Sequence, residues 1–214
     1  MDIFSALQNR ISANHFDHSH RLTDKHIDEL VEAALQAPSA YNLQHTRFLA
    51  VTNAVAKQAL QDIAYGQAKI TAAAVTFIVL ADLEAHRKLP AILEASVNAG
   101  IIEAEKATNS INTATRIYSA DAVLARDEAI RSASMAAMAL MLAATAKGWA
   151  SCPMIGFNSK KLSAQFIISE RYLPVMLIAV GLASDGNLVR KPRLPVDEIL
   201  VRDVHPMQSH AFSH

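Results

Sequence analysis

Apolar residues recur at helical spacing in the stretch between Thr23 and Pro38. The stripe, with members three and four residues apart, consists of Ile27, Leu30, Val31, Ala34 and Leu35. Thr23 is a favoured N-cap residue, and Asp24 places a negative charge in the first turn, where the helix dipole stabilises it. Because proline ends a helix, the pattern predicts a helix that begins after Thr23 and stops by Pro38.

Three shorter apolar runs predict β-strands, at residues 47–52, 75–80 and 174–182. A second amphipathic helix is predicted at residues 54–63. The run at 75–80 (VTFIVL) is β-branched and almost continuously apolar, which is typical of a strand covered on both faces. We therefore expect the sheet to be the middle layer between two layers of helices.

A long helix is predicted from Arg126 to Lys147, in a stretch rich in Ala and Met, with Gly148 as its C-terminal stop. The helix is apolar on nearly every side, so it must be buried on nearly every side. Packing against its own copy in a dimer would achieve this, and so would a central position within a monomer. The segment from about Leu89 to Ile117 is helical in composition, but its irregular pattern defines no element.

The chain reads as a single domain, residues 1–214, because no internal repeat, low-complexity stretch or Gly/Ser-rich linker divides it. Asp185, Gly186 and Asn187 predict a turn after the last strand. Prolines at positions 192, 195 and 206 then exclude regular helix and central strand. Residues 186–214 are expected to run as an extended arm over a surface.

Composition and charge restrict the partners and the cellular compartment expected for the protein. Twenty basic and twenty acidic residues cancel, so no overall field draws the chain to nucleic acid or to an anionic membrane. The longest uncharged run, between Arg131 and Lys147, has fifteen residues, fewer than the ~20 of a membrane helix. Cys152 is the single cysteine, so no internal disulfide can form. With no signal peptide at the Met-Asp-Ile start, a cytoplasmic protein is expected.

Several kinds of catalytic site are disfavoured by the residues themselves. His15, His18 and His20 lie close together, but no cysteine and only one carboxylate accompany them, so we interpret them as loop histidines and expect no metal site. Cys152 lacks the local motif of a cysteine hydrolase and is expected to be a small buried packing residue. The glycine motifs of serine hydrolases, Rossmann folds and P-loops do not occur.

Four segments, in order along the chain, resemble the motifs of one family. Residues 10–17 (RISANHFD) resemble the N-terminal Arg-x-Ser-x-(Arg/Lys)-x-Phe motif of the nitroreductase-like flavin oxidoreductases. Residues 37–44 (APSAYNLQ) resemble that family's Ala-Pro-Ser-x-x-Asn-x-Gln signature. Residues 148–157 (GWASCPMIGF) resemble its third landmark, and residues 191–195 (KPRLP) resemble its C-terminal basic motif.

The resemblance implies an architecture. It implies an α+β fold, a nitroreductase-like three-layer arrangement with a central mixed β-sheet flanked by helices, in an intertwined homodimer. One FMN is then bound at each end of the dimer interface by residues of both chains. The long helix from Arg126 resembles the family's dimer-core helix, and residues 186–214 resemble the arm that crosses to the partner subunit.

The resemblance also assigns residues to FMN. Arg10 and Arg193 would hold the phosphate through charge-assisted hydrogen bonds, with Lys191 as a further cation. The expected cofactor-binding residues are Arg10, Ile11, Ser12, Asn14, Pro38, Ser39, Asn42, Gln67, Pro153, Met154, Ile155, Gly156, Lys191 and Arg193. Pro38, Ser39 and Asn42 would reach the FMN bound mainly by the other subunit. The backbone of residues 153–156 would pass beside the isoalloxazine ring.

The implied activity is that of an FMN-dependent oxidoreductase. Hydride would pass from NADH or NADPH through flavin N5 to a small aromatic acceptor of quinone or nitroaromatic type, in a ping-pong mechanism. No side chain is assigned as a catalytic acid or base, because the flavin carries the chemistry. Asn14 replaces the family's usual Arg or Lys, and His45 and Thr46 replace its common Pro-Trp pair. These departures motivate an alternative, an FMN-binding dimer with a storage, sensing or interaction role; a specialised flavoenzyme of the same fold is a third possibility.

Overall fold

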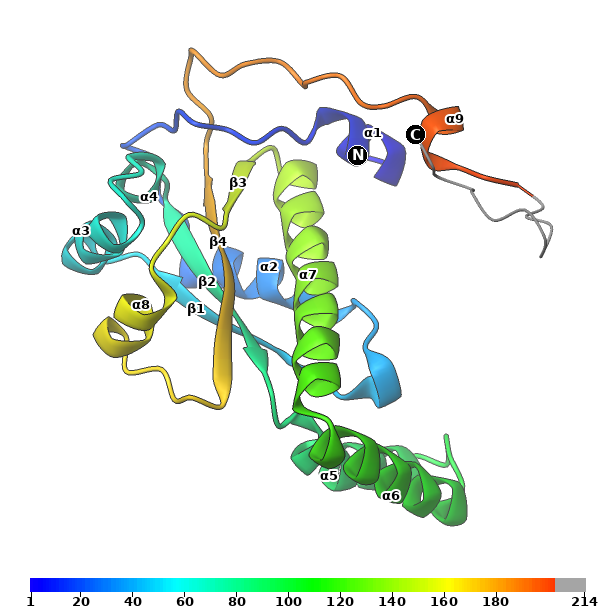
Figure 1. Ribbon diagram of the computed structural model, residues 1–214. Coiled ribbons are helices and arrows are strands. Elements are labelled where there is room, and N and C mark those ends of the chain that lie inside the picture. Colours follow the sequence, from blue (N-terminus) through cyan, green and yellow to red (C-terminus); the bar gives the residue numbers. More distant parts are fainter. Residues whose placement is uncertain (203–214) are drawn as a thin grey trace.

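The computed structural model describes residues 1–202 as a four-stranded sheet between two layers of helices, with two further helices projecting from one end (Figure 1). The strands are β1 (Thr46–Val51), β2 (Val75–Asp82), β3 (Ala150–Met154) and β4 (Tyr172–Gly181). The α-helices are α1 (Ile3–Asn9), α2 (Asp24–Leu35), α3 (Ala54–Ile63), α4 (Lys69–Ala72), α5 (Leu89–Asn98), α6 (Ala104–Ala120), α7 (Ala122–Ala146), α8 (Ser159–Gln165) and α9 (Val196–Ile199). Two 3-10 turns complete them, η1 (Ala40–Asn42) and η2 (Ala85–Lys88).

The sheet has the order β1-β2-β4-β3, and every pair of neighbouring strands is antiparallel. The α+β class and the layered arrangement are confirmed, but the expected mixed sheet is not formed within the described residues. The last residue of β1 pairs with the start of β2, as Val51 with Thr76. Helices α3 and α4 connect the two strands at the same end of the sheet, so β2 runs back antiparallel to β1. Within residues 1–202 a parallel pairing occurs only as an isolated bridge between Ser12 and Ser151.

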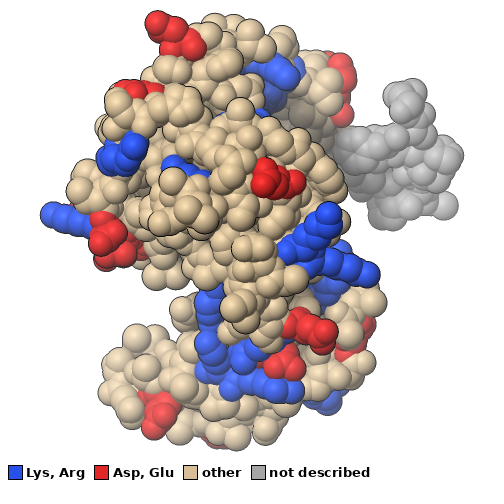
Figure 2. Space-filling view, turned by 90° about the vertical axis from the view of Figure 1, so that its left-hand side faces the viewer, with Lys and Arg blue, Asp and Glu red and all other residues tan. Residues whose placement is uncertain are grey.

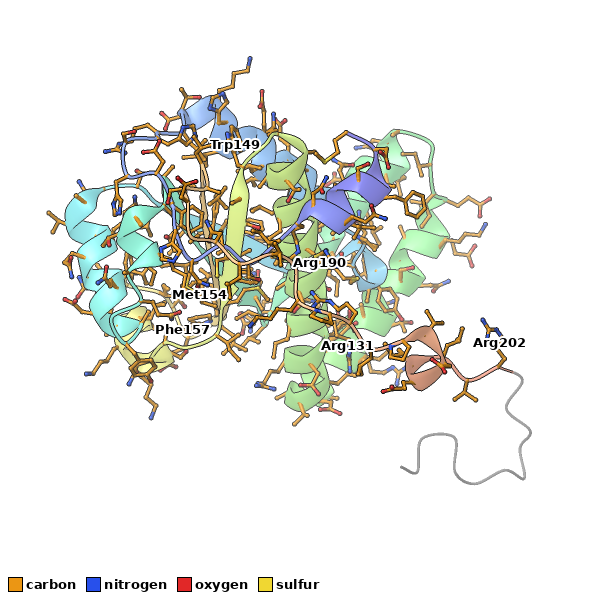
Figure 3. The ribbon with its side chains drawn as sticks, turned by 90° about the horizontal axis from the view of Figure 1, so that it is seen from above. Arg131, Trp149, Met154, Phe157, Arg190 and Arg202 are labelled. Carbon is orange, nitrogen blue, oxygen red and sulfur yellow. The ribbon has the colours of Figure 1, made fainter. Side chains whose placement is uncertain are left out.

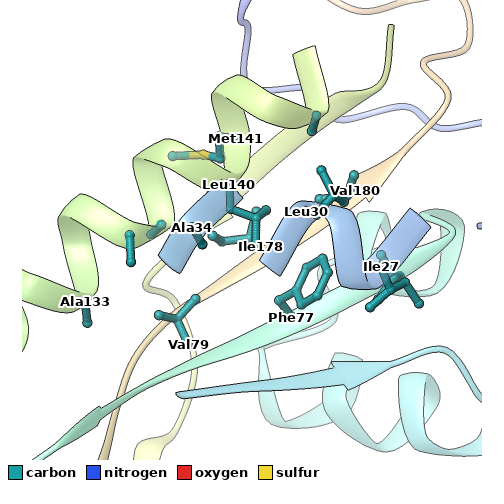
Figure 4. Packing of buried hydrophobic residues seen from close by; sticks show 14 of the residues in the cluster. Ile27, Leu30, Ala34, Phe77, Val79, Ala133, Leu140, Met141, Ile178 and Val180 are labelled. Atoms are coloured by element: carbon teal, nitrogen blue, oxygen red, sulfur yellow. The ribbon is translucent and has the colours of Figure 1, made fainter. Parts of the chain in front are cut away.

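Side chains of the central strands alternate between two cores. The first core joins β2 and β4 to α2 and α7 (Figure 4), and includes Ile27, Leu30, Ala34, Phe77, Val79, Ala133, Leu140, Met141, Ile178 and Val180. The second lies on the opposite face of the sheet, where Ile78, Leu80, Leu177 and Ala179 pack with residues of α3, α4 and α8. All eight residues of β2 are buried, as predicted for a strand covered on both faces.

The long helix is α7, which begins four residues earlier than predicted because Asp121 caps it. The Asp121 carboxylate accepts hydrogen bonds from the N–H groups of Val123 and Leu124, both at 2.9 Å. Within the described residues α7 alone is long and apolar enough to cross a membrane, and half of its most apolar window is buried inside the chain. Its other side stays accessible in a single chain, including Met135, which is 40% exposed.

The segment that the sequence left undefined forms α5 and α6, which project from one end of the sheet (Figure 1). A separate small core holds them together, in which Leu89 and Leu93 pack with Ala107, Ala114 and Tyr118. Because most of these contacts are made within the projection and not against the sheet, the apolar positions do not follow one continuous stripe. The irregular pattern therefore has a structural cause.

After β4 the chain runs as an extended arm above the N-terminal segment (Figure 1). The expected turn forms, with Gly186 in the left-handed region at φ +92°. The expectation of no regular helix in this stretch is wrong at one point, since α9 forms a single turn at Val196–Ile199. Pro195 precedes it at φ −66°, a value that suits the start of a helix. Pro206 lies outside the described residues.

Candidate functional site

A basic cleft lies where the N-terminal segment, α4, β3 and the C-terminal arm meet. Its volume is about 400 Å³, and it is lined by Arg10, Ile11, Ser12, Asn14, Lys69, Cys152, Pro153, Leu188, Val189, Arg190, Lys191 and Arg193. Five of these residues are Lys or Arg, and none is Asp or Glu. The structure thus brings seven of the sequence-predicted residues to one place, drawn from segments nearly 180 positions apart. A neutral chain thereby acquires a local site for an anion.

Asn187 fixes the arm against the N-terminal segment. Its Oδ1 accepts hydrogen bonds from the N–H groups of Asn14 at 2.7 Å and His15 at 3.1 Å. Its Nδ2 donates to the carbonyl oxygens of His15 at 2.8 Å and Ser184 at 2.9 Å. The Ala13 N–H in turn donates to the Ser151 carbonyl at 3.1 Å, which ties the same segment to β3. The cleft therefore has a backbone framework held on both sides.

Arg190 makes a second link between the arm and the N-terminus (Figure 3). Its guanidinium donates to the carbonyl oxygens of Leu7, Gln8 and Arg10, which lie in the last turn of α1 and just beyond it. These carbonyls lack partners inside the helix, so a cation there satisfies them and complements the helix dipole. Arg190 was not predicted from the sequence, because its role depends on how the arm folds back.

Arg10 is a cation of the cleft that has a buried polar atom without a partner in residues 1–202. Its Nη1 is buried and forms no hydrogen bond within the described chain. Burial lowers the pKa of its guanidinium, and repulsion from Arg190 and Arg193 lowers it further. A buried charge without a partner is costly, whereas an anion in the cleft would offset both the burial and the repulsion. The residues present therefore fit a phosphate group.

Lys69 is a site residue that the sequence reasoning missed. Its Nζ lies 2.8 Å from Asn14 Oδ1 and 3.5 Å from Cys152 Sγ, and it lines the cleft. Asn14 stands where the motif that this segment resembles has Arg or Lys, and Lys69 brings a positive charge next to it from α4. The sequence offered one signal for Lys69, its position two residues after Gln67, an expected cofactor-binding residue. Cys152 is 3% exposed, which confirms it as a packing residue.

Gln67 and the segment after β3 also come together, since Gln67 Nε2 donates to the Gly156 carbonyl at 2.8 Å. The sequence did not predict β3 as a strand, although it placed residues 153–156 at the site. Met154 is buried in the core, and Ile155 is 83% exposed. Pro153 has no N–H, and across residues 1–202 the N–H groups of Ile155 and Gly156 form no hydrogen bond. Those two groups are the donors that this segment can offer.

Pro38, Ser39 and Asn42 lie elsewhere, in the loop around η1 between α2 and β1, well away from the arm (Figure 1). The loop has a defined but unusual backbone. Tyr41, Asn42 and Gln44 have φ of 53°, 56° and 50°, a region that non-glycine residues rarely adopt. Ser39 Oγ accepts a hydrogen bond from the Gln44 N–H at 2.9 Å, which stabilises the turn. Within one chain these three residues do not reach the basic cleft.

His45, which replaces part of the family's Pro-Trp pair, is a core residue. It is 3% exposed and packs edge-on against Tyr118, with ring centroids 6.3 Å apart. Burial lowers the pKa of its imidazole, opposed by the negative charges of Glu128 and Asp82. His45 is therefore neutral at neutral pH and adds no charge near the loop.

Replacing Asn187 by Ala is expected to lower the free energy of unfolding by about 1–2 kcal/mol, because four hydrogen bonds between the arm and the N-terminal segment are lost. Urea unfolding followed by circular dichroism measures this change. Asn109→Ala, on an exposed face of α6, is the control and should stay within about 0.5 kcal/mol of the wild type. Equal stabilities of N187A and N109A would show that Asn187 does not hold the arm.

An antiparallel sheet between helical layers, with a cation-lined cleft under a C-terminal arm, defines the class: an α+β protein with a site for an anionic group. The family model described as "Nitroreductase family" matches residues 7–182. The chain belongs to the nitroreductase family.

Individual relatives agree with the family assignment. MhqN of Bacillus subtilis, provisionally named an NAD(P)H nitroreductase, is 34% identical over 193 residues, covering 89% of this chain and 94% of MhqN. YodC of the same organism, with the same provisional name, is 36% identical over 177 residues, covering 83% and 87%.

Solved structures show the same fold. The provisionally assigned nitroreductase ydfN of Bacillus subtilis superposes with a TM-score of 0.88 at 32% identity, covering 92% of this chain and 97% of that one. A provisionally assigned nitroreductase from Exiguobacterium sibiricum, solved in complex with FMN, gives a TM-score of 0.89 at 25% identity, covering 95% and 98%. The nitroreductase-like fold expected from the four motifs is confirmed.

Proposed function

We propose that this protein is a cytoplasmic FMN-dependent NAD(P)H oxidoreductase that reduces a small aromatic acceptor of the quinone or nitroaromatic type. The observation that carries the proposal is the Arg10 guanidinium, whose buried Nη1 has no partner within residues 1–202, in a cleft with four more cations. A flavin phosphate supplies the negative charge that this cleft lacks. The FMN complex of a structural relative, and the names of the NAD(P)H nitroreductases among the sequence relatives, support the same choice.

In this proposal different residues of the cleft bind different parts of FMN. Arg10, Lys191 and Arg193 are proposed to bind the phosphate, while Ser12, Asn14 and Lys69 offer further polar contacts in the same cleft. Gln67 lies two residues before Lys69 of the cleft, and Ile155 and Gly156 follow Pro153, which also lines it. In this proposal Gln67 and the N–H groups of residues 155 and 156, which have no partner within residues 1–202, donate hydrogen bonds to the ring. When bound, FMN supplies reversible two-electron redox chemistry, accepting hydride from a nicotinamide and giving it to the acceptor.

A second copy of the chain completes the site in this proposal. Pro38, Ser39 and Asn42 belong to a loop remote from the cleft of their own chain, so they can contact FMN only across a dimer interface. The accessible apolar side of α7 is the surface for that interface, and the arm from residue 186 onward crosses to the partner. The single-domain organisation of residues 1–214 is part of the same proposal.

A visible absorption spectrum tests the function. Purified protein is mixed with FMN and desalted, and NADH or NADPH is then added anaerobically. We expect retained flavin bands that bleach with one of the two nicotinamides, because the cleft binds FMN and the ring stays accessible to a donor. Retained flavin that bleaches with neither would favour the FMN-binding dimer without efficient reductase activity. A desalted protein without flavin bands would contradict the cofactor assignment.

Steady-state kinetics test the mechanism. In a ping-pong scheme the nicotinamide leaves before the acceptor occupies the same place, so double-reciprocal plots at several acceptor concentrations should be parallel. A quinone and a nitroaromatic serve as the two acceptor probes. Intersecting lines would instead show that donor and acceptor are bound together.

A further inference from the structure

A second basic cleft lies on the other side of α4 from the flavin cleft. Its volume is about 420 Å³, and its lining includes His18, Arg21, Thr52, Lys57 and Thr71. Lys69 lines the flavin cleft and Thr71, two residues later, lines this one, so the short helix α4 separates the two. No Asp or Glu is among the lining residues.

Lys57 is the unusual residue of this cleft. It is only 7% exposed, although lysine is almost never buried without a partner of opposite charge. Its Nζ donates one hydrogen bond, to the Ala73 carbonyl, and in residues 1–202 no carboxylate forms an ion pair with it. An ammonium group has three donors, so two remain for another acceptor. Burial lowers the pKa of Lys57, and the nearby positive charge of Arg21 lowers it further.

Arg21 brings a second cation to the same cleft. Its Nη1 donates to the carbonyl oxygens of His18 at 2.5 Å and His20 at 2.9 Å, which holds the guanidinium in place. Its other N–H groups form no hydrogen bond in the part of the chain that is described, and no carboxylate pairs with it there. Two like charges therefore face one cleft without compensation, an arrangement that an anion would stabilise.

We propose that this cleft binds a phosphate-class oxyanion, held by Lys57 and Arg21 and by the hydroxyl group of Thr52. A phosphate dianion matches two cations in charge, and its oxygens can accept the donors that Lys57 and Arg21 leave free. The cleft has room beyond a single phosphate, so the group can be free phosphate or a phosphomonoester. The face that carries α3, α4 and α8 has scattered charges on a largely uncharged surface (Figure 2), so this site is a local feature.

Calorimetric titration of the FMN-loaded protein with inorganic phosphate, at constant ionic strength, tests the proposal. We expect saturable binding that Arg21→Gln weakens about tenfold or more, because charge-assisted hydrogen bonds are lost. Lys57→Gln should act in the same way. Because Lys57 is buried, its variant can fail to fold, so the test is decided by the variant of the exposed residue Arg21. Lys160→Gln removes an exposed cation outside the cleft and should bind phosphate like the wild type.

Two further arms separate this site from the flavin cleft and identify the source of the phosphate. FMN occupies the flavin cleft of the loaded protein, so phosphate that binds at Arg21 and Lys57 should neither release the flavin nor change its absorption spectrum. Glycerol 3-phosphate that binds more tightly than inorganic phosphate would identify a phosphomonoester as the ligand class, and the reverse order would identify the free anion. No saturable phosphate binding, or binding that survives Arg21→Gln unchanged, would overturn the proposal.

Discussion

Replacing Arg10 by Ala should weaken FMN binding by about 10- to 150-fold, the range for the loss of charge-assisted hydrogen bonds worth about 1.5–3 kcal/mol. The expectation follows from Arg10, which lines the cation-rich cleft and whose buried Nη1 has no partner within the described chain. Arg193 should cost less on replacement, toward the lower end of the range. It is exposed, and its Nη1 already donates to the carbonyls of Lys191 and Pro192.

Quenching of FMN fluorescence on titration with protein measures this change. Lys160→Ala is the matched control, because it removes an equally charged but exposed residue of α8 that lies outside the cleft. Affinity should also fall with rising salt in the wild type and less steeply in R10A, since one charge contact is missing. Wild-type FMN affinity in both R10A and R193A would refute the phosphate assignment.

Elements with a strong local pattern could be predicted from the sequence. The helix α3 occupies residues 54–63 as expected, and Thr23 caps α2 through a hydrogen bond from the His26 N–H. The strand β3 was missed because its five residues (ASCPM) carry weak β-propensity, and only pairing with β4 makes them a strand. The helix α1 was missed because its seven residues are too few for an apolar periodicity to stand out.

For the site, too, residues in local motifs could be predicted and residues that depend on tertiary contacts could not. Arg10, Ser12, Lys191 and Arg193 belong to short linear motifs, so the resemblance could point to them directly. Lys69, Arg190 and Asn187 act through contacts between segments far apart along the chain, such as the 2.8 Å contact of Lys69 with Asn14. Such a contact leaves no local pattern, because it depends on how α4 and the arm are placed. The assignment of Asn42 to a partner's cofactor stays a prediction.

The assignment of Asn42 to the partner's cofactor requires a dimer, and a charge on α7 is expected to disrupt that dimer. The wild-type protein is expected to have twice the 23.2 kDa mass of one chain in light scattering. Met135→Glu would place a charge on the accessible apolar side of α7, where Met138, Ala139 and Leu142 are also only partly buried. An unpaired charge in a desolvated interface costs several kcal/mol, so the dimer should weaken about a hundredfold or more.

The consequence for FMN distinguishes an interface role from a general loss of stability. Val55→Glu is the control, because Val55 is 79% exposed at the start of α3, where a negative charge suits the helix dipole. V55E should remain dimeric and keep FMN. M135E should become monomeric, remain folded by circular dichroism and lose FMN on desalting, because Pro38, Ser39 and Asn42 then reach no cofactor. A monomeric M135E that retains FMN with wild-type affinity would show that one chain holds the whole site, and a dimeric M135E would place the interface elsewhere.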